Sequence, residues 1–121
     1  MKKTKMLKKN YQFRNVFKKG RYYTGIYIEA FIKQNIKNNK YNYLGIAISS
    51  KIGKAVRRNR IKRLIRENYK NLESNIETGQ EIIFLWKKQA DIKNATFKNI
   101  QDDVIKILKN ANIYLKNEYE E

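Results

Sequence analysis

Several residue types are missing or scarce in this chain of 121 residues, and each absence narrows its chemistry. There is no cysteine, which excludes disulfides, thiolate nucleophiles and cysteine-bound zinc. There is no histidine, which removes the commonest general base and the commonest metal ligand. There is no proline, there are only five glycines, and no internal repeat or flexible linker is evident. A conventional protein enzyme is therefore hard to build from this sequence.

Long hydrophobic runs are missing as well. No apolar run approaches the ~18–20 residues that a membrane span needs, and none follows the charged N-terminus as a signal peptide would require. The expected compartment is therefore the cytoplasm, with no membrane partner. Hydrophobic residues make up 41% of the chain, which is enough for one modest core. We expect a single domain over residues 1–121, with a mobile basic arm at 1–9 and an acidic tail at 116–121.

Basic residues are abundant, and the formal net charge is +17. Residues 1–21 carry nine Lys or Arg and no acid, and residues 51–70 carry nine more against one acid, Glu67. The rest of the chain holds ten basic and ten acidic side chains, so the whole excess lies in two segments. Such segments on a neutral scaffold are typical of a polyanion-binding protein, since each Lys or Arg on a phosphate releases condensed counterions. A surface for solubility or for anionic lipid is the alternative interpretation.

The hydrophobic pattern predicts six elements in the order α-β-β-α-β-α. They are a short helix at 10–20, strands at 22–33 and 43–49, a long helix at 54–72, a strand at 81–86, and a last helix from Asn94 or Thr96. A polar turn at 35–42 joins the first two strands, which predicts an antiparallel hairpin. The strand at 81–86, EIIFLW, is strongly apolar, as is typical of a strand buried on both faces. The expected fold is an α/β (α+β) sandwich, with three helices on a small, mostly antiparallel sheet of about four strands.

Periodicity also assigns side chains to faces and helix ends. In the first strand, the buried face is expected to hold Ile26, Ile28, Ala30 and Ile32, and the opposite, mixed face to hold Tyr27, Glu29, Phe31 and Lys33. In the last helix, the inward residues are expected to be Phe97, Ile100, Val104, Ile107 and Leu108. Asn10 is predicted to cap the first helix and Gly20 to end it in the left-handed conformation. Trp86 is predicted to be a core residue.

No catalytic or metal site can be assembled from the acidic residues. The carboxylates show no metal-site spacing, and the neighbours Asp102 and Asp103 point about 100° apart on a helix. The stretch GKAVRRNR lacks the second glycine and the GK[ST] ending of a phosphate-binding loop. We therefore expect no catalytic residue, no metal ligand and no cofactor held by the protein. If the chain belongs to an enzyme, another molecule must supply the catalytic groups.

The segment 51–66, KIGKAVRRNRIKRLIR, carries the most specific signal. On a helix, Ile61, Leu64 and Ile65 share one face, and the opposite face is basic. The expected RNA-binding residues are Arg57, Arg58, Asn59, Arg60, Lys62, Arg63 and Arg66. Guanidinium groups match phosphate oxygens bidentately, and an asparagine among them can read a base edge or a 2′-hydroxyl. The alternative is the solvated face of an ordinary amphipathic helix.

This segment, with its core NRIKRLIRE, closely resembles the RNR motif of the protein component of bacterial ribonuclease P. The resemblance covers about residues 7–115 and includes LKKNYQFRNVFKKG, IEAFIK and LGIAISSKIGKAV. It implies an α/β sandwich whose RNR helix sits in a left-handed β-α-β crossover. It also implies that a catalytic RNA performs the Mg²⁺-dependent removal of the 5′ leader from precursor tRNA. The protein, inactive alone, is then expected to bind that RNA and the leader.

The resemblance further implies roles for individual residues. The residues of the RNR helix that resemble those that contact RNA, chiefly the catalytic RNA, are Arg58, Asn59, Arg60, Lys62, Arg63 and Arg66. The positions that match the family's leader-binding cleft, between the first helix and the sheet, are Phe13, Phe17, Phe31, Ser49 and Lys51. Phe31 stands where a tyrosine is common, so the ring face is kept and a hydroxyl contact is lost. Periodicity alone assigns Phe13 and Phe17 to the core, whereas a ring with one open face can stack an unpaired base for ~1–3 kcal/mol.

Two other functions fit parts of the sequence. A plain RNA-binding module, such as a small ribosomal protein, would use the basic arm and the Arg-rich helix but leave the cleft aromatics without a role. A DNA-binding helix would suit the Arg and Lys density, but no turn and second helix precede Lys54, so duplex DNA is not an expected partner. The expected partners are the catalytic RNA and precursor tRNA.

Overall fold

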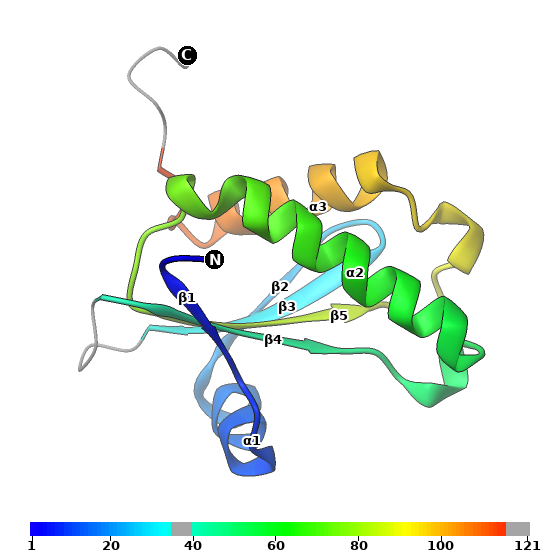
Figure 1. Cartoon of the computed structure of the whole chain (residues 1–121), viewed down its shortest axis with the longest axis horizontal. Helices are drawn as coiled ribbons and strands as arrows, with labels where there is room; N and C mark the ends of the chain where they lie inside the picture. Colours follow the sequence, from blue (N-terminus) through cyan, green and yellow to red (C-terminus); the bar gives the residue numbers. More distant parts are fainter. Residues whose placement is uncertain (35–39, 116–121) are drawn as a thin grey trace.

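A five-stranded mixed sheet lies at the centre of the structure, a computed structural model that describes residues 1–34 and 40–115 (Figure 1). The strands are β1 (Thr4–Met6), β2 (Arg21–Thr24), β3 (Ile28–Gln34), β4 (Asn42–Ala47) and β5 (Gln80–Trp86), in the spatial order β1-β4-β5-β3-β2. The helices are α1 (Asn10–Lys19), α2 (Ala55–Leu72) and α3 (Phe97–Asn110), with short 3-10 turns at Ser50–Ile52, Glu73–Asn75 and Ile92–Asn94. Helices α2 and α3 cover one face of the sheet, and α1 covers the other.

Two of the predicted features fall outside this description. Most of the polar turn predicted at 35–42 and the acidic tail predicted at 116–121 lie beyond the described residues. Within residues 1–34 and 40–115, no helix is both long enough and apolar enough to cross a membrane.

The pairing of the strands corrects the predicted sheet. The single strand predicted at 22–33 is two strands, β2 and β3, which form an antiparallel hairpin. Strands β3 and β4 do not pair, because β5 lies between them, antiparallel to β3 and parallel to β4. The predicted hairpin of 22–33 with 43–49 is therefore wrong, and the sheet is mixed with five strands instead of mostly antiparallel with about four. The physical reason is that β5 is apolar on both faces, which suits the centre of a sheet that is covered on both sides.

The first strand belongs to the segment predicted as a mobile arm. β1 pairs in parallel with β4, with Thr4 opposite Asn42 and Met6 opposite Leu44. The hydroxyls of Thr4 and Tyr69 share a buried hydrogen bond of 2.8 Å, which ties β1 to α2. Residues 1–9 are thus not a mobile arm throughout: Thr4 and Leu7 are buried and Met6 is half-buried, while the lysines of the stretch are exposed.

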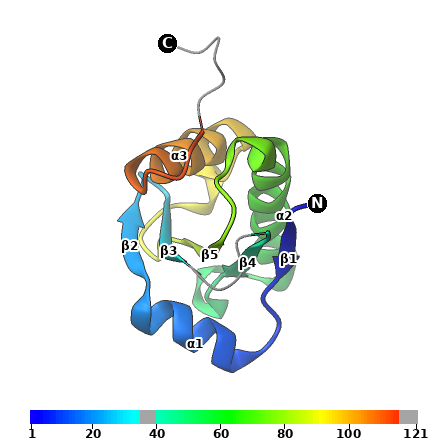
Figure 2. The ribbon, with the colours of Figure 1, turned by 90° about the vertical axis from the view of Figure 1, so that its left-hand side faces the viewer.

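Helix α2 connects the parallel neighbours β4 and β5, so these three elements form a β-α-β unit. In Figure 1, α2 lies above the sheet and both strands point to the right; Figure 2 shows that β5 lies behind β4 in that view. The crossover is therefore left-handed, as the family resemblance implies, whereas nearly all such connections are right-handed. Hydrophobic periodicity carries no signal for this hand.

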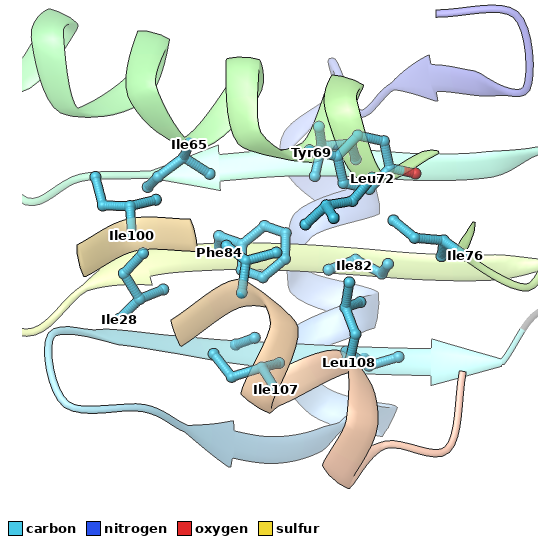
Figure 3. Packing of buried hydrophobic residues seen from close by; sticks show 14 of the residues in the cluster. Ile28, Ile65, Tyr69, Leu72, Ile76, Ile82, Phe84, Ile100, Ile107 and Leu108 are labelled. Atoms are coloured by element: carbon cyan, nitrogen blue, oxygen red, sulfur yellow. The ribbon is translucent and has the colours of Figure 1, made fainter. Parts of the chain in front are cut away.

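The main core lies between the sheet and the layer of α2 and α3 (Figure 3). Inward side chains of β3 and β5, such as Ile28, Ile82 and Phe84, meet apolar residues of both helices. The helix residues recur at helical spacing and are Ile61, Ile65, Tyr69 and Leu72 from α2, and Ile100, Val104, Ile107 and Leu108 from α3. Each fully buried Ile or Leu side chain contributes roughly 1.5–3 kcal/mol to folding.

The predicted faces are largely confirmed by this core. Those that are buried as predicted are Ile28, Ala30, Ile32, Trp86 and the four apolar residues of α3 named above. Two predictions are wrong: Ile26 is 67% exposed, because it lies in the β2–β3 turn, and Phe97 is 38% exposed, because it is the first residue of α3.

A single carboxylate of α3 holds the β2–β3 turn. Asp103 is 2% exposed and accepts hydrogen bonds from the backbone N–H groups of Ile26, Tyr27 and Ile28, at 2.9, 2.6 and 2.9 Å. Gly25 is required beside it, because a Cβ at that position would overlap the Asp103 carboxylate. This contact breaks the predicted long strand into two and fixes α3 to the hairpin.

The helix ends agree with prediction only in part. Of the two predicted starts of the last helix, Asn94 and Thr96, it is Thr96 that caps α3, accepting from the backbone N–H of Asn99 at 3.1 Å. Asn10, predicted as the cap of α1, is instead its first helical residue. Gly20, predicted to be left-handed, is extended, with φ of −77° and ψ of 159°. The glycine is needed for space, since a Cβ there would lie 2.6 Å from the Val16 carbonyl oxygen.

Candidate nucleic-acid interface

Helix α2 presents a strip of basic side chains to solvent. Because Ile61, Ile65 and Tyr69 are buried in the core, the remaining sides of the helix face outward. Of the seven predicted RNA-binding residues, those exposed are Arg57, Asn59, Arg60, Arg63 and Arg66, and those half-buried are Arg58 and Lys62. We call these seven residues the basic strip. All of them lie outside the core, as the sequence predicts.

Two arginines of the basic strip are held by backbone carbonyl groups. Arg58 donates from Nη1 to the carbonyl oxygen of Gly53 at 2.6 Å, and at 3.5 Å to that of Ser50. Arg60 donates from Nη1 to the carbonyl oxygen of Ala95 at 2.9 Å. Each guanidinium keeps its charge, but its orientation is fixed. These bonds tie α2 to the loop before it and to the segment that leads into α3.

Most charges of the basic strip have no carboxylate partner. Among the described residues, the one ion pair made by residues 51–70 joins Arg63 and Glu67, with 3.9 Å between Nε and Oε1. Both side chains are more than half exposed, and such pairs contribute only ~0–1 kcal/mol. Residues 1–21 make no ion pair with any described residue. Unneutralised positive charge of this density raises the local potential and attracts a polyanion.

A groove of about 490 Å³ lies beside α1, where β4 and β5 end. It is lined by Asn10, Phe13, Ile46, Ala47, Ile48, Ser49, Lys62, Leu85 and Lys88. The apolar residues can contact the flat face of a base, and the two lysines can contact phosphates. The groove therefore combines the two kinds of surface that single-stranded nucleic acid needs.

Phe13 of α1 lies against the strand that borders the groove. A Cβ on Gly45 of β4 would come within 2.7 Å of Phe13 Cε1, so the glycine gives the ring direct access to the strand. Phe13 remains half-buried. Its ring is thus partly packed on the sheet and partly open to solvent, and it forms part of the groove wall.

Phe17 and Phe31 do not line this groove but contact each other further along α1. Their ring centroids are 5.2 Å apart in an edge-to-face arrangement, and Tyr22 extends the group, with its ring centroid 5.4 Å from that of Phe31. We call Phe17, Tyr22 and Phe31 the aromatic cluster. Phe17 is 36% exposed and Tyr22 is 51% exposed, so ring surface is open to solvent. The Tyr22 hydroxyl donates to Glu29 at 2.6 Å, and this bond raises the pKa of Tyr22.

The strand register explains how one helix borders both features. Tyr22, Phe31, Ile83 and Gly45 lie opposite one another across β2, β3, β5 and β4. Helix α1 crosses this row, with Phe13 over Gly45 and Phe17 against Phe31. Two residues further along β5 and β4, the paired Leu85 and Ala47 line the groove. The groove and the aromatic cluster therefore share one face of the sheet.

The other predicted cleft residues divide between groove and rim. Ser49 lines the groove, and its hydroxyl accepts from the backbone N–H of Lys51 at 3.2 Å. Lys51 is exposed but does not line the groove. Lys62, predicted only as part of the helix face, does line it, as do Lys88 and Asn10, which were not among the predicted residues. Lys88 could have been found by recognising that parallel strands β4 and β5 bring their following residues to one edge of the sheet.

Carboxylates form no metal centre in the described part of the chain. No group of three or more Asp or Glu side chains lies close enough to hold an ion. Asp103 is turned inward to the β2–β3 turn, while its neighbour Asp102 pairs with Lys98 at 2.9 Å on the surface.

Comparison with known sequences identifies one family. A family model described as Ribonuclease P matches residues 1–112. The chain is 37% identical over 113 residues to the Ribonuclease P protein component of Clostridium botulinum (strain Langeland), covering 93% of this chain and 98% of that protein. It is 38% identical over 112 residues to the protein of the same name from Clostridioides difficile (strain 630), covering 92% and 95%.

Comparison with solved structures gives the same family. The RNase P protein of Staphylococcus aureus aligns with a TM-score of 0.79 and 34% identity, covering 90% of this chain and 96% of that one. The RNase P protein of Thermotoga maritima aligns with a TM-score of 0.74 and 27% identity, covering 88% and 96%.

Proposed function

The chain belongs to the ribonuclease P protein family, and from that premise we propose that its two surfaces divide the recognition of two RNAs. The family's protein is a subunit of the ribonucleoprotein that processes the 5′ end of tRNA. In our proposal the basic strip binds the catalytic RNA. The groove and the aromatic cluster bind the 5′ leader of precursor tRNA, with Lys51 at the rim. The chain would do this in the cytoplasm.

One observation carries the proposal, namely that the two surfaces meet at Lys62. This residue belongs to the basic strip and also lines the groove, together with Phe13 and Ser49. A leader in the groove would therefore lie against the same helix that faces the catalytic RNA. The arrangement supports simultaneous binding of both RNAs on a continuous surface.

The chemistry of the reaction would then be divided between protein and RNA. The chain has no histidine or cysteine, and its described carboxylates form no metal centre. We propose that the catalytic RNA holds the Mg²⁺ ions and carries the hydrolysis. Lysine and arginine side chains on the two surfaces would neutralise phosphates that otherwise need Mg²⁺, so the protein should matter most at low Mg²⁺.

Reconstitution tests this proposal. The purified chain, the catalytic RNA of the same genome and a precursor tRNA would be combined at low Mg²⁺, with each component also tested alone. We expect the chain alone to leave precursor tRNA intact and the chain with the RNA to cleave it faster than the RNA alone. Cleavage by the chain without RNA, or no gain over the RNA alone, would contradict the proposal.

A further inference from the structure

A second pocket lies at the opposite end of the sheet from the groove. It measures about 380 Å³, at the small end of ligand pockets, and is lined by Arg21, Tyr23, Ile32, Gln34, Glu77, Gln80, Ala111, Asn112 and Ile113. Gln80 begins β5, and Leu85 near its other end lines the groove, so the two sites are separated by roughly 17 Å along the strand. The chain leaves β3 and enters β5 at this end, which faces the viewer in Figure 2.

The end of α3 shapes one side of this pocket. Asn112 has a left-handed backbone, with φ of 60°, and its N–H donates to the carbonyl oxygen of Lys109 at 3.0 Å. The N–H of Ile113 donates to the carbonyl oxygen of Leu108 at 3.1 Å. These two bonds make a Schellman motif, which ends the helix and turns the chain across the strands. Asn112 is therefore held at the pocket by backbone geometry.

Gln80 is the buried polar residue of this pocket. It is 2% exposed, and its side-chain amide makes no hydrogen bond with any described residue, although its backbone N–H donates to Asn42 Oδ1 at 2.9 Å. The Gln80 side chain lines the pocket and its amide is not sealed from solvent, so a ligand placed there would replace water as its hydrogen-bond partner.

The two charged residues of the pocket have opposite signs and do not pair. Arg21 and Glu77 both line it, yet no nitrogen of the one lies within 4.0 Å of an oxygen of the other, and neither pairs with another described residue. A lone anion would be repelled by the carboxylate, and a lone cation by the guanidinium. A neutral ligand with separate donor and acceptor edges would satisfy both charges at once.

We propose that the pocket of Arg21, Glu77, Gln80 and Asn112 binds a guanine base. Guanine presents acceptors at O6 and N7, which a guanidinium contacts bidentately, and donors at N1 and N2, which a carboxylate accepts. The amides of Gln80 and Asn112 both donate and accept, so they can pair with either edge. Adenine keeps N7 but has an amino group in place of O6 and no donor at N1, so it would lose the bidentate contact with the guanidinium and the paired donors to the carboxylate. The source is a free guanine nucleotide or an unpaired guanine in RNA.

Nuclear magnetic resonance titration of the full chain tests this assignment. GMP and AMP would be added separately at raised salt, which weakens phosphate binding elsewhere and leaves the comparison of bases. We expect GMP to shift the side-chain amide signal of Gln80 and the backbone signals of Arg21 and Asn112, with at least fivefold tighter binding than AMP. No shift at these signals, or equal binding of the two nucleotides, would overturn the proposal.

A substitution that removes the charge of Glu77 but keeps its shape tests whether the carboxylate recognises the base. Glu77 is exposed, so Glu77→Gln should fold normally, and we expect it to weaken GMP at least fivefold while leaving AMP unchanged. Asp102→Asn is the matched control, since it removes one exposed carboxylate of α3 outside the pocket and should change neither affinity. Equal effects of the two variants on GMP would also overturn the proposal.

The source of the base is resolved by comparing three probes. These are GMP, the single-stranded RNA UUGUU and the same RNA with uridine in place of guanosine. Shifts of the pocket signals with UUGUU but not with the all-uridine RNA support a guanine carried in RNA. Shifts with GMP and not with UUGUU support a free nucleotide. Equal shifts of the pocket signals with both RNAs would contradict recognition of guanine.

Discussion

At the scale of single residues, two neighbouring aspartates have unrelated roles. Asp103 is buried and accepts three backbone N–H groups of the β2–β3 turn, while Asp102 is exposed and pairs with Lys98. The sequence predicts only that the two point in different directions on a helix. It does not reveal which one is buried, because that depends on how α3 lies across the hairpin.

Replacement of these aspartates should affect stability very differently. Asp103→Ala would leave three N–H groups of the turn without their acceptor, and we expect the free energy of unfolding to fall by about 3 kcal/mol or more. Asp102→Ala removes an exposed ion pair and should change it by only ~0.3–0.5 kcal/mol. Urea unfolding followed by circular dichroism measures both values. Similar losses for the two variants would rule out the role assigned to Asp103.

Tyr69 should make stability depend on alkaline pH. Burial of this side chain raises the pKa of Tyr69 above its ordinary value near 10, so the folded state holds the phenol proton more tightly than the unfolded state. Its contribution is therefore complete below about pH 10 and is lost as the pH rises through the raised pKa. We expect the wild-type chain to lose more stability than Tyr69→Phe between pH 9 and about pH 11, measured by urea unfolding. Parallel pH curves for the two chains would contradict this.

At the scale of elements, α1 lies across the sheet and carries a ring toward both the groove and the aromatic cluster, the two features proposed to bind the leader. Replacing Phe17 by Ala removes exposed ring surface from the aromatic cluster while Val16, the buried residue of α1, stays in place. We expect affinity for precursor tRNA to fall about 5- to 150-fold, which corresponds to the ~1–3 kcal/mol of one stacked base, with mature tRNA affected far less.

Phe97→Ala is the matched control for that variant. Phe97 is exposed to nearly the same extent, 38% against 36%, but lies on α3 on the other face of the sheet. Filter binding with precursor and mature tRNA would compare the two variants. An equal loss for both tRNAs in Phe17→Ala would favour a plain RNA-binding module.

The arginines of α2 fall into two classes by their hydrogen bonds. Arg58 is bound to the carbonyl oxygen of Gly53 and orders the loop that follows the groove residue Ser49, whereas Arg63 has only a long, exposed contact with Glu67. We expect Arg63→Ala to weaken binding of the catalytic RNA, with the salt slope reduced by about 0.7–0.9, and to leave stability unchanged.

Arg58→Ala should instead act through structure. It removes a charged hydrogen bond at 2.6 Å, so we expect a loss of stability of about 1–2 kcal/mol together with weaker binding of the leader. Thermal unfolding and leader binding, measured on both variants, separate the two classes. Identical profiles for the two variants would remove the distinction.

At the scale of the whole molecule, the sequence predicted local structure better than pairing. The α2 face, the buried strand β5 and the cap at Thr96 follow from periodicity and capping, which act within a few residues. The parallel pairs β1–β4 and β4–β5 could not be predicted, because they join segments about 40 residues apart and leave no local pattern. The β4–β5 pair brings Ser49 and Lys88 to one groove, so Lys88 could not be predicted as a groove residue without knowing that pair.

The charge pattern can be read without knowing the strand pairing, because the positions of charged residues along the chain do not depend on it. The excess of +17 in two segments indicated two contact regions. The aromatic rings of α1 and β3 indicated a leader-binding surface only through the family resemblance. The roles of Arg58 and Arg60 in holding backbone could not be read from sequence, since their carbonyl partners are fixed by the positions of loops.

The place of β5 at the centre of the sheet has a consequence for synthesis of the chain. Of the five strands it is the last to be made, since it begins at Gln80, while its neighbours β3 and β4 are complete by Ala47. At about 5–20 residues per second, a ribosome needs roughly 2–7 s to cover that gap. During this time the sheet lacks its middle strand, and both basic segments emerge before the fold can close. During its first seconds the nascent chain is therefore an unfolded polycation beside ribosomal RNA. Its basic segments can contact that RNA before the fold that positions them has formed.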